Sequence, residues 1–97
     1  EQAPPPLDEG IFSALEATIK ARKKELPEGS YTTHLFTSGT EKIRKKTGEE
    51  AVELILAGTP EEQTYEAADL IYHMMVLFAS EDIPFSRVLE ELRKRTK

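Results

Sequence analysis

The sequence has 97 residues, of which 38% are hydrophobic and 32% are charged, and its formal net charge is −5. These values suit one soluble, helix-rich domain with a modest core, exclude a disordered chain and argue against non-specific nucleic-acid binding. The absence of cysteine excludes disulfides and thiolate chemistry and is compatible with a reducing cytoplasm. No signal peptide is visible, and the longest apolar run, residues 70–79, is too short to span a membrane.

The first residues are rich in proline and start with Glu1 instead of methionine, so we interpret the chain as processed, trimmed or cut from a longer one. We expect residues 1–7 to be an extended lead-in or linker remnant and residues 8–97 to form the domain. A first helix should begin near Asp8, a suitable N-cap, and end before the turn pattern Pro27-Glu28-Gly29.

A short second helix should begin at Ser30-Tyr31-Thr32, with Ser30 as its N-cap. Hydroxyl side chains at a helix start suit an anion or nucleotide contact, because free N–H groups are available there. The alternative, which composition alone favours, is a capped connector. His34 has no second histidine at metal-ligand spacing, so a surface or hydrogen-bonded role is favoured over metal ligation.

The third helix should run from Glu41 to Ala57, with Thr40 as its N-cap. Its first part is basic and contains Lys42, Arg44, Lys45 and Lys46. Its second part is acidic and contains Glu49, Glu50 and Glu53. A basic turn before an acidic turn suits a phosphorylated substrate, because cations hold phosphate oxygens while acids hold a bridging metal. The alternative is pairing within the helix, from Lys45 to Glu49 and from Lys46 to Glu50.

A capping-box pattern, Thr59-Pro60-Glu61-Glu62, should begin a fourth helix that runs to about Ser80. A last helix should follow Pro84 and end in the basic residues 93–97, where cations suit a helix C-terminus. We therefore expect an all-α fold of four main antiparallel helices plus one short helix. Some helices are apolar around so much of their circumference that we also expect a homodimer.

Acidic residues of the third and fourth helices give the strongest functional signal. Helices joined by a short connection pack antiparallel, so their acidic faces should meet. This would bring together five carboxylates, those of Glu49, Glu50, Glu53, Glu66 and Asp69. Like charges in a partly dry site repel, and a hard divalent cation relieves that repulsion. We therefore expect a Mg²⁺ site, the alternative being a solvated acidic face. His73 lies near these acids, either as a contact or as a satisfied histidine at the core edge.

Several segments resemble the phosphoribosyl-ATP pyrophosphatase family, which belongs to the all-α, MazG-like nucleoside-triphosphate pyrophosphatases. The resemblance extends from Phe12 to Lys97. It rests on Ser30-Tyr31-Thr32, Ser38-Gly39-Thr40, Lys45-Lys46-Thr47-Gly48-Glu49-Glu50-Ala51-Val52-Glu53, Glu66-Ala67-Ala68-Asp69-Leu70-Ile71-Tyr72-His73 and Leu92-Arg93-Lys94-Arg95. The acidic motifs are common to the whole superfamily, whereas the serine-tyrosine-threonine start, the paired lysines and the tyrosine-histidine pair narrow the resemblance to this family.

This resemblance implies Mg²⁺-dependent hydrolysis of the nucleotide phosphoribosyl-ATP to phosphoribosyl-AMP and pyrophosphate, the second step of histidine biosynthesis. It implies a cytoplasmic homodimer with no nucleic-acid or membrane partner, fused in some members to phosphoribosyl-AMP cyclohydrolase. Mg²⁺ on the five carboxylates would position a water for in-line attack, with Glu50 or Glu53 as the candidate base. The candidate substrate contacts are Ser30, Tyr31, Thr32, Lys42, Lys45, Lys46, Tyr72 and His73.

Two other readings of the same residues stay open. One is a house-cleaning pyrophosphatase that uses the same acids on dUTP, dCTP or modified nucleotides. The other is a non-catalytic helical dimerisation module whose acids form only a solvated face.

Overall fold

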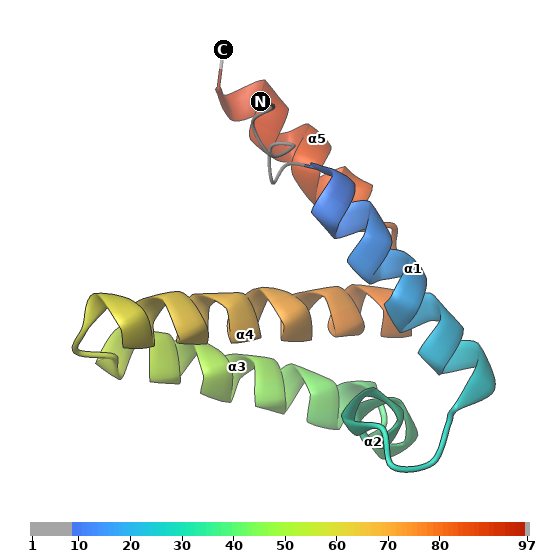
Figure 1. Cartoon of the computed structure of the whole chain (residues 1–97). Helices are drawn as coiled ribbons and strands as arrows, with labels where there is room; N and C mark the ends of the chain where they lie inside the picture. The colour runs from blue at the N-terminus through green and yellow to red at the C-terminus, as the bar shows by residue number, and fades with distance from the viewer. Residues whose placement is uncertain (1–8, 97) are drawn as a thin grey trace, which may run out of the picture.

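Five α-helices and no strand make up residues 9–96, the part of the chain that the computed structural model describes (Figure 1). They are α1 (Glu9–Glu25), α2 (Tyr31–Ser38), α3 (Thr40–Leu56), α4 (Pro60–Ser80) and α5 (Ser86–Arg95). The expected all-α fold with one short helix is therefore confirmed. The expected lead-in at residues 1–7 and the expected N-cap Asp8 lie outside the described residues. Within residues 9–96, no helix combines the length and the apolar character needed to cross a bilayer.

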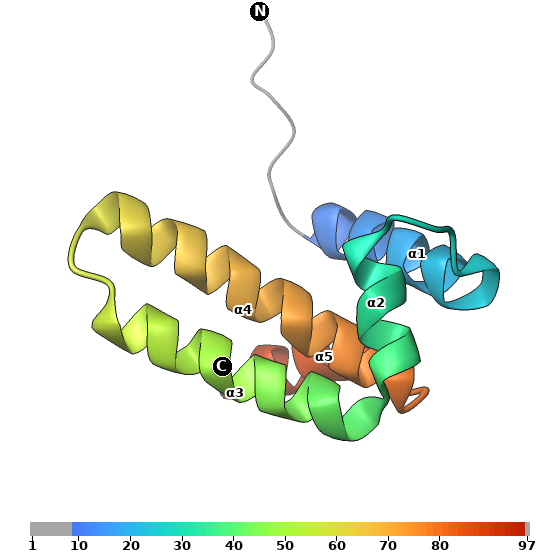
Figure 2. The same ribbon diagram turned by 90° about the horizontal axis from the view of Figure 1, so that it is seen from below.

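Helices α3 and α4 form a long antiparallel hairpin that positions the acidic residues (Figures 1 and 2). Its turn follows the predicted capping pattern, because Thr59 Oγ1 accepts a hydrogen bond from the Glu62 backbone N–H at 3.1 Å and Pro60 is the first helical residue. The reciprocal bond differs from a standard capping box. The Glu62 carboxylate accepts from the backbone N–H of Gly58 at 3.0 Å, one residue before the cap.

The predicted N-cap of α3 is wrong by one residue. Gly39 is the N-cap and Thr40 is already helical. Gly39 has a φ of 96°, a conformation that glycine adopts without a Cβ clash and that turns the chain between α2 and α3. The Thr40 hydroxyl is instead hydrogen-bonded to Ser80 Oγ at the end of α4. An ion pair of 2.6 Å between Arg44 and Glu81 joins the same two helix ends.

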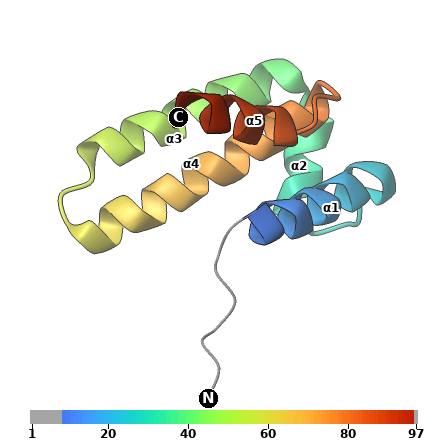
Figure 3. The same ribbon diagram turned by 90° about the horizontal axis from the view of Figure 1, so that it is seen from above.

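The hydrophobic core lies at the end of the hairpin that is remote from its turn. Its buried members are Ile19, Leu35, Ile43, Met75, Val76, Ala79 and Phe85. Figures 2 and 3 show how it is enclosed, since α1 and α3 lie on opposite flanks of α4 and α2 crosses that end. The turn end of the hairpin has no such cover, and there Ile55 and Leu56 are 77% and 75% exposed.

Candidate functional site

The acidic faces of α3 and α4 meet at Glu50 and Asp69. Glu50 is only 6% exposed, although it is charged, and His73 beside it is 1% exposed. A carboxylate oxygen of Glu50, one of Asp69 and a ring nitrogen of His73 lie within 4.8 Å of one another. The hairpin therefore brings one acid from each helix into the same partly buried place.

Two further predicted ligands lie on the same side of the hairpin, towards its turn. Glu53 and Glu66 line one cavity of about 280 Å³ together with Glu62. Partial desolvation raises the pKa of Glu66, and the negative charges of Glu53, Glu50, Asp69 and Glu62 raise it further. Four of the five predicted carboxylates thus repel one another, which is the arrangement that a divalent cation relieves.

Glu49, the fifth predicted ligand, lies apart from this group. Its side chain is 54% exposed, and the ammonium nitrogen of Lys46 is 3.8 Å from its carboxylate. It lines a different cavity, between α2 and α3. The structure thus places Glu49 at the border between the acids and the lysines.

Lys46 is the cation that faces the acidic cluster, and its Nζ lies 3.2 Å from Glu50 Oε2. Burial alone would raise the pKa of Glu50. Hydrogen bonds with Asp69 and Lys46, together with the positive charge of Lys46, outweigh burial and lower that pKa. Burial, followed by the hydrogen bond and the negative charge of Glu50, raises the pKa of Asp69. Glu50 is therefore the carboxylate of this pair that stays ionised, and Asp69 is the one that takes a proton first.

His73 is a buried histidine with both ring nitrogens engaged. Nδ1 lies 2.7 Å from the backbone carbonyl oxygen of Asp69, and because that oxygen can only accept, Nδ1 carries the hydrogen. Nε2 lies 2.8 Å from the hydroxyl of Tyr31, so the neutral ring accepts there. Of the two roles that the sequence left open, the structure shows the hydrogen-bonded histidine at the core edge.

Of the residues at the start of α2, two make hydrogen bonds that stabilise the fold and one lines an open cavity. Ser30 caps α2 as predicted, since its Oγ accepts from the Thr33 backbone N–H at 3.3 Å. Thr32 is buried, and its hydroxyl is hydrogen-bonded to that of Tyr72, whose pKa is raised mainly by burial. Of the predicted contact residues Ser30, Tyr31 and Thr32, Tyr31 lines the cavity between α2 and α3, and the other two do not.

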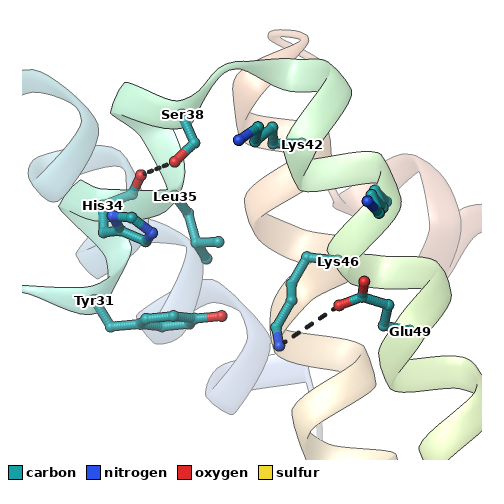
Figure 4. A pocket seen from close by; sticks show the side chains of 8 residues that line it. Tyr31, His34, Leu35, Ser38, Lys42, Lys46 and Glu49 are labelled. Atoms are coloured by element: carbon teal, nitrogen blue, oxygen red, sulfur yellow. Dashed lines mark hydrogen bonds and ion pairs between the residues drawn. The ribbon is translucent and has the colours of Figure 1, made fainter.

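This cavity, which we call the α2–α3 groove, has a volume of about 300 Å³ (Figure 4). It is lined by Tyr31, His34, Leu35, Ser38, Lys42, Lys45, Lys46 and Glu49. The three lysines were predicted from the sequence, whereas His34, Leu35 and Ser38 were not predicted as site residues. The sequence did contain a signal for these three residues. Together with Tyr31 they are spaced three and four residues apart, which places them on one face of α2.

Comparison with known proteins gives one matching family and several named relatives. Residues 12–96 match the model of the family described as phosphoribosyl-ATP pyrophosphohydrolase. The chain is 49% identical over 89 residues to the histidine biosynthesis bifunctional protein HisIE of Bacillus subtilis. The aligned region covers 89% of this chain and 43% of that protein.

Relatives that are named phosphoribosyl-ATP pyrophosphatase alone align with this chain over most of their length. The chain is 44% identical over 88 residues to a phosphoribosyl-ATP pyrophosphatase of Allorhizobium ampelinum, covering 88% of this chain and 85% of that protein. It is 46% identical over 88 residues to the one of Pelobacter propionicus, with coverages of 88% and 82%. The chain thus spans less than half the length of the bifunctional relatives and most of the length of the others.

Proposed function

The chain belongs to the phosphoribosyl-ATP pyrophosphohydrolase family, and on this basis we propose that it hydrolyses phosphoribosyl-ATP to phosphoribosyl-AMP and pyrophosphate. One observation of the structure carries the proposal. The buried carboxylate of Glu50 lies close to Asp69 on one side and 3.2 Å from Lys46 on the other. The carboxylates of Glu50 and Asp69 suit a metal ion, and the ammonium of Lys46 suits a phosphate group. A substrate that consists of a polyphosphate with a bound metal ion requires both kinds of group close together.

We propose Mg²⁺ as the cofactor, because its preferred ligands are the carboxylate oxygens that crowd together here. Glu50 and Asp69 would be the nearest ligands, with Glu53 and Glu66 beside them, while Glu49 stays a predicted ligand. When bound, the cation would neutralise charge on the triphosphate and polarise a water molecule. The nitrogens of His73 already have partners, so we assign this residue to orienting Tyr31 and the backbone of Asp69.

Roles for the chain's own residues follow from their surroundings. Hydrogen bonds with Asp69 and Lys46 keep Glu50 ionised, so Glu50 is a poor proton acceptor and a good anionic ligand. Glu53 is exposed on the same side of the hairpin, opposite Glu66. We therefore assign Glu53 as the general base that takes the proton of the attacking water, and Lys46 as a donor to the phosphate oxygens.

A second copy of the chain is also part of the proposal. Val52, Ile55, Leu56 and Tyr65 all lie near the turn of the hairpin and are more than half exposed. Exposed apolar side chains that gather in one region mark a protein–protein interface more often than a solvated surface. We propose that two copies pack through this part of α3 and α4.

Two further expectations accompany this activity. Because the bifunctional relatives extend well beyond the matched region, we propose that the domain also occurs fused to phosphoribosyl-AMP cyclohydrolase. We place the activity in the cytoplasm, where the precursors of amino-acid synthesis are used. Expression of the full gene and size analysis of the native polypeptide would show whether a second domain is attached.

Product analysis tests the proposed reaction directly. Phosphoribosyl-ATP is incubated with the protein, with Mg²⁺ or with a chelator, and the nucleotides are separated by chromatography. We expect phosphoribosyl-AMP and pyrophosphate only in the presence of Mg²⁺. Faster hydrolysis of dUTP or dCTP under the same conditions would instead indicate a house-cleaning pyrophosphatase. No hydrolysis of any nucleotide would indicate a dimerisation module.

A further inference from the structure

The far end of the α2–α3 groove carries positive charge that the fold itself does not use. Lys46 is paired with Glu50 and Glu49 at 3.2 and 3.8 Å. Lys42 and Lys45 line the same groove, yet neither makes an ion pair with any residue between 9 and 96. With a rise of about 1.5 Å per residue, Lys42 lies roughly 12 Å along the axis of α3 from Glu50. A second anion site is therefore available, separate from the acidic cluster.

The opposite wall of the groove suits a flat ring and a sugar. The rings of Tyr31 and His34 are tilted by only 32° with centroids 6.4 Å apart, and Leu35 beside them in the groove is a buried member of the core (Figure 4). The Tyr31 ring is held in place because its hydroxyl is bonded to His73. The Ser38 hydroxyl donates to the His34 carbonyl oxygen at 2.7 Å. The Ser38 oxygen is thereby left as an acceptor, which suits a sugar hydroxyl and not a phosphate oxygen.

Phosphoribosyl-ATP carries one group that ATP lacks, a second ribose 5-phosphate attached to the adenine ring. We propose that the α2–α3 groove binds this ribose 5-phosphate, with Lys42 and Lys45 on its phosphate and Ser38 on its sugar. The inference rests on the proposed function, which places the triphosphate at the acidic cluster. The groove would then be the part of the molecule that distinguishes phosphoribosyl-ATP from ATP.

A different use of the lysines would be to hold the β- and γ-phosphates of the triphosphate. ATP and phosphoribosyl-ATP share those phosphates, so loss of the lysines would weaken both nucleotides equally. In our assignment the lysines contact only the additional phosphate, so their loss weakens phosphoribosyl-ATP alone. The two uses therefore predict different effects of the lysine substitutions on the ratio of the affinities for phosphoribosyl-ATP and ATP.

The first experiment needs neither metal nor turnover. Ribose 5-phosphate and inorganic phosphate are titrated separately into the metal-free protein, and backbone amide shifts are followed by NMR. We expect shifts centred on Ser38, Lys42 and Lys45, and binding of ribose 5-phosphate about threefold or more tighter than that of phosphate, the scale of one neutral hydrogen bond. In Ser38→Ala that preference should disappear. Equal binding of the two ligands by the wild-type protein, or shifts elsewhere, would overturn the inference.

The second experiment measures discrimination between nucleotides in the presence of Mg²⁺. The double variant K42Q/K45Q is compared with K20Q/K24Q, which loses the same charge from exposed positions on α1 that do not line the groove. We expect K42Q/K45Q to raise the KM for phosphoribosyl-ATP at least about tenfold, the scale of a lost charge-assisted bond. Inhibition by ATP should stay within about twofold of wild type, and the control should change neither value. Equal weakening of both nucleotides would assign the lysines to the triphosphate, and an unchanged KM would make them a solvated face.

Failure of the inference and failure of the proposed function give different results. A protein that binds ribose 5-phosphate in the groove but hydrolyses nothing contradicts the reaction and leaves the groove assignment standing. A protein that hydrolyses phosphoribosyl-ATP but shows no ribose 5-phosphate binding contradicts the groove assignment alone.

Discussion

The hydroxyl of Tyr31 on α2 lies 2.8 Å from Nε2 of His73 on α4, and this bond joins the α2–α3 groove to the acidic cluster. On the groove side, the bond fixes an aromatic ring that is almost half exposed. On the cluster side, it fixes a histidine whose other nitrogen holds the backbone of Asp69. The orientation of the groove wall and that of a predicted metal ligand therefore depend on one hydrogen bond.

Removal of the Tyr31 hydroxyl should destabilise the fold. Tyr31→Phe leaves His73 Nε2 without its partner in a buried position, and we expect a loss of about 1–2 kcal/mol in the free energy of unfolding. Urea denaturation measures it. Ser13→Ala is the control, because Ser13 is exposed on α1 and its hydroxyl makes no hydrogen bond within residues 9–96. If the two variants are equally stable, the Tyr31–His73 bond does not form in solution.

Neutralisation of Glu50 should abolish most of the activity without unfolding the chain. In Glu50→Gln the acidic cluster loses its ionised carboxylate and Lys46 loses its partner, so we expect turnover to fall by about 10²-fold or more. Steady-state kinetics with phosphoribosyl-ATP measures the loss, and circular dichroism checks the helices. Glu28→Gln, in the exposed α1–α2 connection, should behave like wild type. Near-normal turnover of Glu50→Gln would remove Glu50 from the mechanism.

Gly48 offers a gain in stability. A Cβ built on this helical residue meets no heavy atom within 4 Å, so Gly48→Ala should stabilise the single chain by up to about 1 kcal/mol. Gly39→Ala is the contrasting variant and should destabilise, because its φ of 96° is strained for alanine. Urea denaturation distinguishes them. A Gly48→Ala protein that is more stable but less active would show that substrate or a second copy approaches this residue.

Stability without metal should respond to pH in opposite senses at Glu50 and Asp69. The lowered pKa of Glu50 gives stability that is present at neutral pH and is lost as the pH falls through that pKa. The raised pKa of Asp69 gives stability that is present at low pH and is lost as the pH rises through that pKa. Asp69→Asn should therefore remove the second component, so that the metal-free variant gains stability relative to wild type as the pH rises from about 4 to 7.

Mg²⁺ should offset that loss, because the proposed cation would bind the ionised form of Asp69. At a concentration about 100-fold above its dissociation constant, a ligand of the folded state stabilises by about 2.7 kcal/mol. We expect the Mg²⁺-dependent rise in Tm to grow with pH and to shrink in Asp69→Asn, as thermal melts at several pH values would show. A rise that is the same at every pH, and the same in the variant, would indicate general screening of a solvated acidic face.

The exposed end of the hairpin predicts the oligomeric state. Ile55 and Leu56 are 77% and 75% exposed in the single chain, so Ile55→Ser with Leu56→Ser should cost the monomer little. If two copies pack here, the double variant should sediment as a monomer at concentrations where wild type is a dimer. Ile11→Ser, at an exposed apolar position on α1, is the control. A monomeric wild-type protein would contradict the proposed dimer.

Signals confined to a few neighbouring residues made the helices predictable. Ser30 caps α2 and Thr59 caps α4 as predicted, because each cap bonds to a backbone N–H only three residues away. The cap of α3 was predicted wrongly because Thr40 has a competing partner, Ser80, forty residues further along the chain. His73 stayed ambiguous for the same reason, since its partner Tyr31 lies on another helix. Contacts between distant segments leave no local pattern in the sequence.

The parts of the site that lie on one face of a single helix could be predicted from the sequence. The pairing of Lys46 with Glu50 was foreseen from their spacing, whereas that of Lys45 with Glu49 is replaced by a contact from Lys46 to Glu49. Both alternatives are allowed by helix geometry, and side-chain rotamers decide between them. The contribution of His34 and Ser38 depends on how α2 faces α3, which a single-helix pattern does not contain.

The contact between Lys46 and Glu50 also bears on the order of events in a newly synthesised chain. The most deeply buried acid of the hairpin already has a counter-charge 3.2 Å away, supplied from one turn earlier on the same helix. An unpaired charge at that depth would oppose closure of α3 against α4. The chain itself therefore supplies a counter-charge for this buried acid when α3 and α4 come together.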